Sequence, residues 1–196
     1  MNRKNKQDEL KEAILGHYEQ LSAEEIRPLE DARTITESLG YKAEDLDSLP
    51  AEADLGLGCG NPHERARPQA GECVLDLGSG RGLDCFLAAK AVGKTGCVVG
   101  VDALPSMVEK AASIARKEGF GNCHFLQGEI EAIPSESDRF DLVISNCVIN
   151  LSRRKPTVYK EIFRVLKPGG RVAISDITTK KALPAEWVAD PHMAKT

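Results

Sequence analysis

The sequence has 196 residues, enough for one domain with a proper hydrophobic core. Hydrophobic residues make up 41% and charged residues 29%, and the net charge of −4 does not favour a nucleic-acid partner. No apolar run reaches the length of a membrane span, and residues 1–11 lack the apolar core of a secretion signal, so we expect a cytoplasmic protein without a membrane partner.

The first 50 residues are predicted to form a helical cap. Apolar side chains share one face of a helix over residues 8–21, and further helices are expected at 29–39 and 43–49, the last ending before Pro50. Tyr18 lies at the edge of the first apolar face, and the sequence leaves open whether it packs or contacts a ligand.

A glycine-rich loop follows at residues 55–62, with the sequence LGLGCGNP. Three glycines so close together, followed by Asn-Pro, exclude a regular element and indicate a backbone that passes close to another group. Cys59 in its middle is therefore not a core cysteine. The alternative is a tight connector that carries an incidental thiol.

A strand at residues 73–77 leads into a second glycine-rich turn and a helix at 83–92, which is the start of a βαβ unit. Gly78, Gly80 and Gly82 follow the spacing G-x-G-x-G, not the G-x-G-x-x-G of dinucleotide-binding proteins. Asp76 at the end of the strand would repel a pyrophosphate but tolerates a cationic or zwitterionic ligand.

Two further acids follow expected strand ends. Asp102 ends a strand at 97–102, about 20 residues after the glycine turn, where a carboxylate suits a ribose diol. A helix at 105–118 and a strand at 123–127 precede Gly128-Glu129-Ile130. Glu129 either accepts a hydrogen bond from an exocyclic amine or is a solvated turn acid.

The fourth strand, at residues 140–145, is a continuous apolar run that ends in Asn146 and Cys147. Because the carboxyl ends of parallel strands line the ligand crevice, we expect Cys147 at the site. A buried cysteine acting as a small hydrophobic side chain is the alternative.

A helix at 156–166, a break at 167–170 and a fifth strand at 171–176 complete the pattern. After Thr178 only Leu183, Trp187 and Val188 suggest further order. The order of elements predicts an α/β fold, an open and mostly parallel sheet with helices on both faces.

With these features the chain resembles class I S-adenosylmethionine methyltransferases, which are Rossmann-like. Four segments closely resemble arsenite S-adenosylmethionine methyltransferases of microbes: LGLGCGNP at 55–62, DLGSG at 76–80, DC at 84–85 and ISNCVINL at 144–151. The resemblance extends over about residues 8–190. It implies a cap at 1–50, an S-adenosylmethionine-binding domain at 51–178 and a truncated C-terminal extension at 179–196.

The resemblance also implies a chemistry and a set of site residues. Cys59 and Cys147 would hold trivalent arsenic, arsenite or methylarsenite, as catalytic thiolates, and methylation would serve arsenic detoxification with a thiol reductant such as glutathione or thioredoxin. The residues implied in cofactor binding are Tyr18, Asp76, Gly78, Ser79, Gly80, Asp102, Ala103, Met107, Gly128, Glu129, Ile130 and Asn146.

The six cysteines fall into two groups under this interpretation. No C-x-x-C pair exists, which argues against a zinc ribbon, and in a cytoplasmic chain we expect free thiols rather than disulfides. The cysteines with apolar neighbours in strands or in a helix are expected to have packing roles. These are Cys73, Cys85, Cys97 and Cys123.

The sequence departs from the family pattern after the fifth strand. Family members continue with a closing antiparallel strand pair and a further thiol, whereas no cysteine follows Cys147 here. We therefore expect the C-terminal strands to be missing or incomplete, and a third arsenic ligand to come from glutathione, solvent or a cofactor thiol. The exposed sheet edge predicts a homodimer or a partner chain.

Other functions stay open at this point. The chain could methylate a carbon or oxygen acceptor such as a quinone or lipid precursor, which would not need Cys59 or Cys147. It could also be a short form that binds S-adenosylmethionine or arsenite without turnover. A dehydrogenase fits least, and no histidine, His63 included, is expected to act as a base.

Overall fold

The computed structural model describes residues 3–23 and 28–184. Its helices and strands are α1 (Arg3–Ala23), α2 (Leu29–Ser38), α3 (Ala43–Asp47), η1 (Ala51–Ala53), α4 (His63–Ala66), β1 (Cys73–Leu77), α5 (Leu83–Val92), β2 (Cys97–Asp102), α6 (Pro105–Glu118), β3 (Cys123–Gln127), β4 (Phe140–Asn146), η2 (Ile149–Leu151), α7 (Lys155–Val165) and β5 (Leu166–Ser175).

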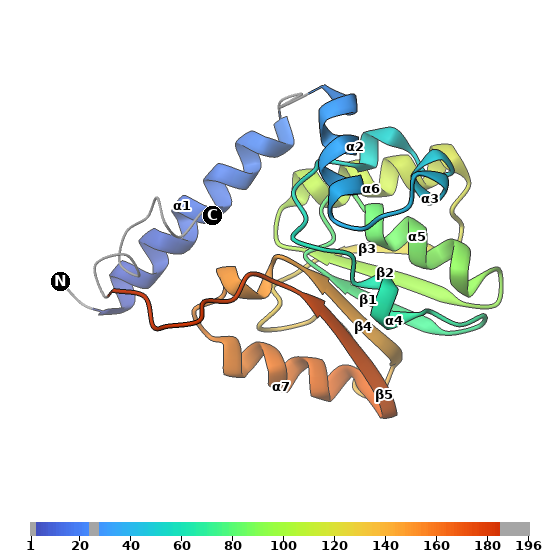
Figure 1. The fold of residues 1–196 in the computed structure, drawn as a ribbon. Coiled ribbons are helices and arrows are strands. Elements are labelled where there is room, and N and C mark those ends of the chain that lie inside the picture. Colours follow the sequence, from blue (N-terminus) through green and yellow to red (C-terminus); the bar gives the residue numbers. More distant parts are fainter. Residues whose placement is uncertain (1–2, 24–27, 185–196) are drawn as a thin grey trace.

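The five strands form one parallel sheet in the order β3-β2-β1-β4-β5 (Figure 1). The chain adds β2 and β3 on one side of β1 and then returns to add β4 and β5 on the other side. The strand order thus reverses between β1 and β4, and ligands of open α/β sheets bind beyond the carboxyl ends of the strands at such a point.

Two apolar cores lie on opposite faces of the sheet. On one face the strands pack against α5 and α6, with Phe86 fully buried and its ring centroid 4.6 Å from that of Phe120. On the other face they pack against α7, through Val158, Ile162 and Val165. The predicted fold class, a Rossmann-like open parallel sheet with helices on both faces, is confirmed.

The helices begin and end where local chemistry favours it. Pro105 occupies the first turn of α6, where its missing N–H costs no hydrogen bond. Gly119 follows α6 in the left-handed conformation that commonly ends a helix.

The C-terminal region differs from the prediction in one respect. A break was expected at residues 167–170, but β5 begins at Leu166, directly after α7. The pairing of β4 with β5 shifts register, from Phe140 opposite Leu166 to Leu142 opposite Arg171, so the glycines are accommodated as an irregularity within the strand. Trp187 and Val188 lie outside the described residues, and the proposed division of the chain at residues 50 and 178 stays a prediction.

Over residues 3–23 and 28–184, none of the helices combines the length and apolar character that crossing a membrane requires.

Substitution of Gly100, in the middle of β2, tests how closely the sheet packs against the glycine turn. A Cβ atom there would lie 2.7 Å from both Cδ1 of Phe125 and Oγ of Ser79. We expect Gly100→Ala to lower the free energy of unfolding by roughly 1–3 kcal/mol, because a packed interior resists an added methyl group. Denaturant titration measures this change.

Gly121→Ala is the matched control, because a Cβ atom at Gly121 meets nothing within 4 Å. Its free energy of unfolding should stay within about 0.5 kcal/mol of the parent. Equal stability of the two variants would contradict the close packing around Gly100.

Candidate functional site

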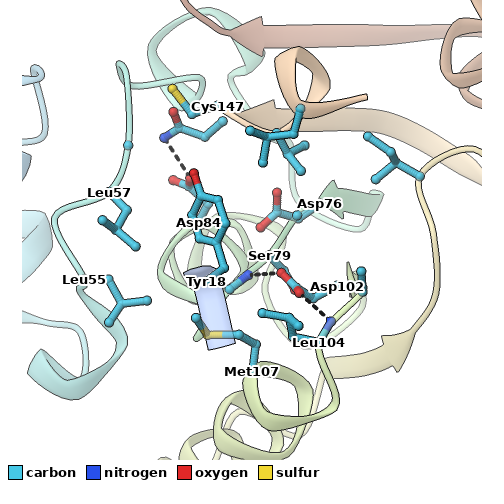
Figure 2. Close-up of a pocket in the computed structure, with 18 of the residues that line it drawn as sticks. Tyr18, Leu55, Leu57, Asp76, Ser79, Asp84, Asp102, Leu104, Met107 and Cys147 are labelled. Carbon is cyan, nitrogen blue, oxygen red and sulfur yellow. Dashed lines mark hydrogen bonds between the residues drawn. The ribbon is translucent and has the colours of Figure 1, made fainter. Parts of the chain in front are cut away.

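A cavity of about 520 Å³ opens beyond the carboxyl ends of β1, β2 and β4 (Figure 2). This volume lies in the range of small-molecule sites. The cavity is lined by Cys147 and by every residue that the sequence assigned to cofactor binding, from Tyr18 on α1 to Asn146 at the end of β4. Cys59 is not part of the lining but is in contact with Cys147, which is.

The glycine turn after β1 is held by the neighbouring strand. The N–H groups of Gly78 and Ser79 donate to the carbonyl of Val101, at 2.8 and 3.1 Å. Gly78 has φ of 72°, and a Cβ atom there would lie 2.6 Å from the side chain of Val148. Only glycine combines this conformation with this approach, so the turn can present its backbone to the cavity.

Asp102 at the end of β2 connects this turn to the start of α6. Its carboxylate accepts hydrogen bonds from the N–H groups of Gly80, at 2.9 Å, and Leu104, at 3.0 Å (Figure 2). Burial raises its pKa, although these backbone N–H groups act in the opposite direction. A carboxylate has further lone pairs, so Asp102 can also accept from a diol.

Asp76 at the end of β1 is a buried acid whose charge is poorly compensated. Its side chain is 2% exposed, and the thiol of Cys85 donates to it at 3.3 Å. Burial, and next the negative charge of Asp84, raise the pKa of Asp76 well above its ordinary value. A ligand that brings a positive charge beside Asp76 would relieve this cost.

A polar network that the sequence analysis did not foresee lies next to Asp76. The hydroxyl of Tyr41 donates to Asp84 at 2.6 Å, and Nε2 of His63 lies 3.1 Å from the same carboxylate. Burial acts to raise the pKa of Asp84, but the contacts with His63, Tyr41 and Asn146 outweigh it and hold this pKa below its usual value. His63 thus has a place beside the cavity, whereas the sequence analysis assigned it no role.

Asn146 fixes the loop that carries Cys59. Its side-chain oxygen accepts from the N–H of Cys59 at 2.9 Å, and its side-chain nitrogen donates to the carbonyl of Gly60 at 2.9 Å. The same nitrogen lies 3.0 Å from the hydroxyl of Tyr41. One amide therefore joins the end of β4, the loop at 55–62 and the Asp84 network. The sequence indicated the neighbourhood of Asn146 but not this contact.

The structure brings Cys59 into contact with Cys147, with the Cα atoms 5.6 Å apart and a sequence separation of 88 residues. It also pairs Cys73 with Cys97, with the Cα atoms 4.6 Å apart. Both separations suit a disulfide. The fold therefore brings each of these two pairs close enough for a disulfide, while the expectation that the cysteines are free thiols in a reducing compartment stays a prediction.

Cys147 is held in an unusual backbone conformation. Its φ is 59°, which is uncommon for a residue with a side chain, and its N–H donates to the carbonyl of Ser175 at 2.8 Å. This bond to the end of β5 supports the turn that directs the Cys147 side chain toward Cys59. Such conformations persist only where the surrounding structure determines them.

Helix α1 contributes Tyr18 to the cavity and is tied to the domain by polar contacts. Lys11 forms an ion pair with Glu129 at 2.5 Å, and Ser106 donates to Glu19 at 2.9 Å. Tyr18 is largely buried, which raises its pKa. The position of α1 beside the cavity is that expected of a lid, although its function as one stays a prediction.

A family model described as a methyltransferase domain matches residues 68–196, more than half of the sequence. This chain belongs to the methyltransferase-domain family. The match includes β1 to β5 and therefore the glycine turn, Asp76, Asp102 and Cys147. Cys59 and the N-terminal helices lie before it.

The chain is also similar to proteins named for arsenic methylation. It is 49% identical, over 80% of its length, to an arsenite methyltransferase of Halobacterium salinarum, of which it covers 40%. A crystal structure of an arsenic(III) S-adenosylmethionine methyltransferase from Chlamydomonas reinhardtii matches 85% of this chain and 54% of its own, with a TM-score of 0.64 and 39% identity. The predicted resemblance is confirmed.

A quinone-pathway methyltransferase is similar as well. A demethylmenaquinone methyltransferase of Lactococcus lactis is 40% identical over 58% of this chain and 45% of its own length. The present chain thus spans less than half of the length of these sequence relatives.

The Asn146 contacts generate a prediction about the cysteine pair. Asn146→Ala removes two hydrogen bonds that hold Cys59 beside Cys147, each contributing about 1 kcal/mol. We expect a disulfide between Cys59 and Cys147 to become roughly 30-fold easier to reduce, since about 2 kcal/mol corresponds to a factor of about 30. Equilibration in glutathione redox buffers, with the disulfide quantified by mass spectrometry, measures this change.

Asn122→Ala is the matched control, because Asn122 also donates to two backbone carbonyls, of Ala89 and Gly93, at 3.1 and 3.0 Å, but at the other end of the fold. It should affect overall stability and leave the cysteine pair unchanged. The same redox shift in both variants would show that Asn146 acts only through global stability.

Proposed function

We propose that this domain binds S-adenosylmethionine in the cavity and transfers its methyl group to trivalent arsenic held by the reduced thiolates of Cys59 and Cys147. One observation carries the proposal: Cys147, which lines the cavity together with Asp76 and the glycine turn, is in contact with the sulfur of Cys59 from a segment 88 residues away. The similarity to arsenite methyltransferases over 80% of the chain supports it.

The residues of the cavity fit S-adenosylmethionine. The cofactor is a cation at its sulfonium, and Asp76 offers an uncompensated buried carboxylate. Ser79 has a buried hydroxyl oxygen for which the described part of the protein provides no hydrogen-bond partner. Asp102 and the N–H-rich turn beside it suit a ribose diol. A neutral or anionic ligand would leave the charge of Asp76 uncompensated.

Methyl transfer from a sulfonium requires little acid–base catalysis by the protein. When bound, S-adenosylmethionine would supply an activated methyl group whose leaving group is a neutral thioether, and Cys59 and Cys147 would hold the arsenic whose lone pair accepts that methyl group. The protein therefore acts by holding the nucleophile in position and excluding water. Cys147 and Cys59 would fix arsenic, and α1 would cover the cavity.

Thiolates are suitable ligands for trivalent arsenic because both are soft. Binding requires the reduced form of Cys59 and Cys147, which a thiol reductant such as glutathione or thioredoxin would maintain. Two protein thiols leave one arsenic position, which glutathione, solvent or a cofactor thiol would fill. Reductants of this kind are cytoplasmic, and arsenic detoxification in that compartment is the role we propose.

Methyl transfer to a carbon acceptor is the second candidate. The similarity to a demethylmenaquinone methyltransferase favours it, as do the apolar side chains that line the cavity. Those side chains include Leu10, Ile14, Leu15, Leu55 and Leu57. A flat apolar acceptor would pack against them without needing either cysteine, so thiol substitution separates the two candidates.

We also propose that two copies associate through β5. In the described part of the chain this strand pairs only with β4, which leaves its other edge available for a further strand. Apolar side chains are exposed nearby, among them Phe163 at 83% and Val172 at 48%. Sedimentation equilibrium should give a dimer, and a monomer at high concentration would overturn this proposal.

Cysteine substitution tests the arsenic site. We expect Cys59→Ser and Cys147→Ser each to lower arsenite methylation by at least about 100-fold, because misplacing the nucleophile removes most of the acceleration. S-adenosylmethionine affinity should stay nearly unchanged, as measured by calorimetry. Products are identified by mass spectrometry with arsenite, glutathione and labelled cofactor.

Cys97→Ser is the control, because Cys97 lies at the opposite end of the sheet. It should retain both methylation and cofactor binding. Arsenite methylation that survives in Cys59→Ser and Cys147→Ser alike would exclude the thiol site, whereas cofactor binding without any methylated arsenic would indicate a binding protein.

Asp76→Asn tests the cationic ligand. Because the pKa of Asp76 is raised on folding, its contribution to stability is present at low pH and is lost as pH rises through the folded value. Asparagine does not titrate, so the stability of Asp76→Asn relative to the parent should increase from about pH 4 to pH 8. Thermal unfolding across this range measures the difference.

The same substitution should weaken S-adenosylmethionine binding by at least about tenfold, equivalent to 1.4 kcal/mol, because the favourable charge interaction is removed. Calorimetry at pH 7.5 measures the affinity. Unchanged affinity would mean that Asp76 does not face the cationic part of the ligand.

A further inference from the structure

The fold sorts the six cysteines into three pairs, of which only one lies at the cavity. Cys85 and Cys123 are neighbours in the core, where Sγ of Cys123 lies 3.6 Å from the carbonyl oxygen of Cys85. Cys73 and Cys97 stand side by side at the amino ends of β1 and β2. We propose that this last pair, when reduced, is a second dithiol site that binds monosubstituted trivalent arsenicals.

The backbone alone brings these two sulfur atoms together. Cys73 is the register partner of Cys97 in the parallel ladder, and their Cα atoms are 4.6 Å apart. Side chains at paired positions of neighbouring strands point to the same face of a sheet. Cys73 packs against the core on the α7 side, so both thiols belong to that face.

This pair is separate from the cavity. Leu77, where the glycine turn begins, lies four residue steps along β1 from Cys73, and at about 3.3 Å per step that is roughly 13 Å. The site is therefore independent of the methyl transfer proposed above, and a ligand at one end of the strands does not occupy the other.

The dithiol is positioned before a ligand arrives. The N–H of Cys73 donates to the carboxylate of Asp141 at 2.8 Å, and the N–H of Cys97 donates to the carbonyl of Glu72 at 3.0 Å. Lys167 in turn binds the same carboxylate at 2.8 Å. Little ordering remains to oppose binding, which favours a ligand that bridges both sulfur atoms.

Exposure distinguishes this pair from the core pair. Cys73 and Cys97 are both partly exposed, whereas Cys85 and Cys123 are buried. Burial raises the pKa of Cys123 to about 12 and that of Cys85 well above its ordinary value. Because the thiolate is the form that binds metals and metalloids, the core pair is a poor ligand and the Cys73–Cys97 pair the better one.

The binding step needs no oxidant. A monosubstituted arsenical of the form R–As(OH)₂ has two exchangeable hydroxyl groups, and two thiols replace them with release of two waters. Arsenic stays trivalent and two As–S bonds form. The match between two thiols and two exchangeable positions favours this class over inorganic arsenite, which would keep one hydroxyl.

Intact-mass spectrometry with phenylarsine oxide tests the proposal. The starting protein is the reduced double variant Cys59→Ser, Cys147→Ser, in which the cavity pair is absent. After removal of excess reagent we expect one phenylarsenic adduct per chain. Adding Cys97→Ser or, separately, Cys73→Ser should abolish it, and circular dichroism establishes that each variant is folded.

Adding Cys123→Ser to the same double variant is the matched control, and the adduct should persist there. A double variant without an adduct would overturn the proposal, including the case in which the Cys73–Cys97 disulfide resists reduction. An adduct that survives both Cys73→Ser and Cys97→Ser would assign the reagent to the core cysteines and overturn it equally.

Discussion

The amide of Asn146 is the contact on which the rest of the site depends. The parallel sheet brings the end of β4 to the switch point, but the loop at 55–62 has no helical or strand ladder of its own to hold it there. Asn146 provides two hydrogen bonds to that loop and one contact to Tyr41. Through these, Cys59 reaches Cys147 although 88 residues separate them. An apolar side chain at this position would leave the N–H of Cys59 and the carbonyl of Gly60, both partly buried, without this partner.

The site also contains two acidic side chains close together in the protein interior. Asp76 and Asp84 are both buried, and the protein compensates only one of them fully. His63, Tyr41 and Asn146 surround Asp84 and lower its pKa, whereas the pKa of Asp76 is raised. A buried carboxylic acid with a raised pKa is unfavourable for the charged form, and such perturbed groups are concentrated at functional positions. We therefore interpret the Asp84 network as the support of the site and Asp76 as the group that meets the ligand.

Much of this fold is predictable from the sequence because its signals are local. Glycines, Pro105 and apolar runs of strand length place β1 to β4 and the helices α5 and α6 within a residue or two. The start of β5 was not predictable, since a run containing Pro168 and two glycines normally interrupts a strand. Only pairing with β4, which shifts register there, keeps that segment within the sheet. Tertiary contacts override local preference at such positions.

The candidate site, like the fold, was predictable from the sequence only in part. Residues that follow strand ends could be placed because topology alone sends them to the switch point, as for Asp102 and Cys147. Tyr41 and His63 could not be placed, since they lie in or next to short helices whose orientation depends on contacts with Asp84. The cysteine pairs show the limit most clearly. Spacing in the sequence says nothing of register, yet register alone sets Cys73 opposite Cys97. A chain with six thiols therefore has to be sorted in space, and the sorting leaves one pair at the cavity, one in the core and one at the far end of the sheet.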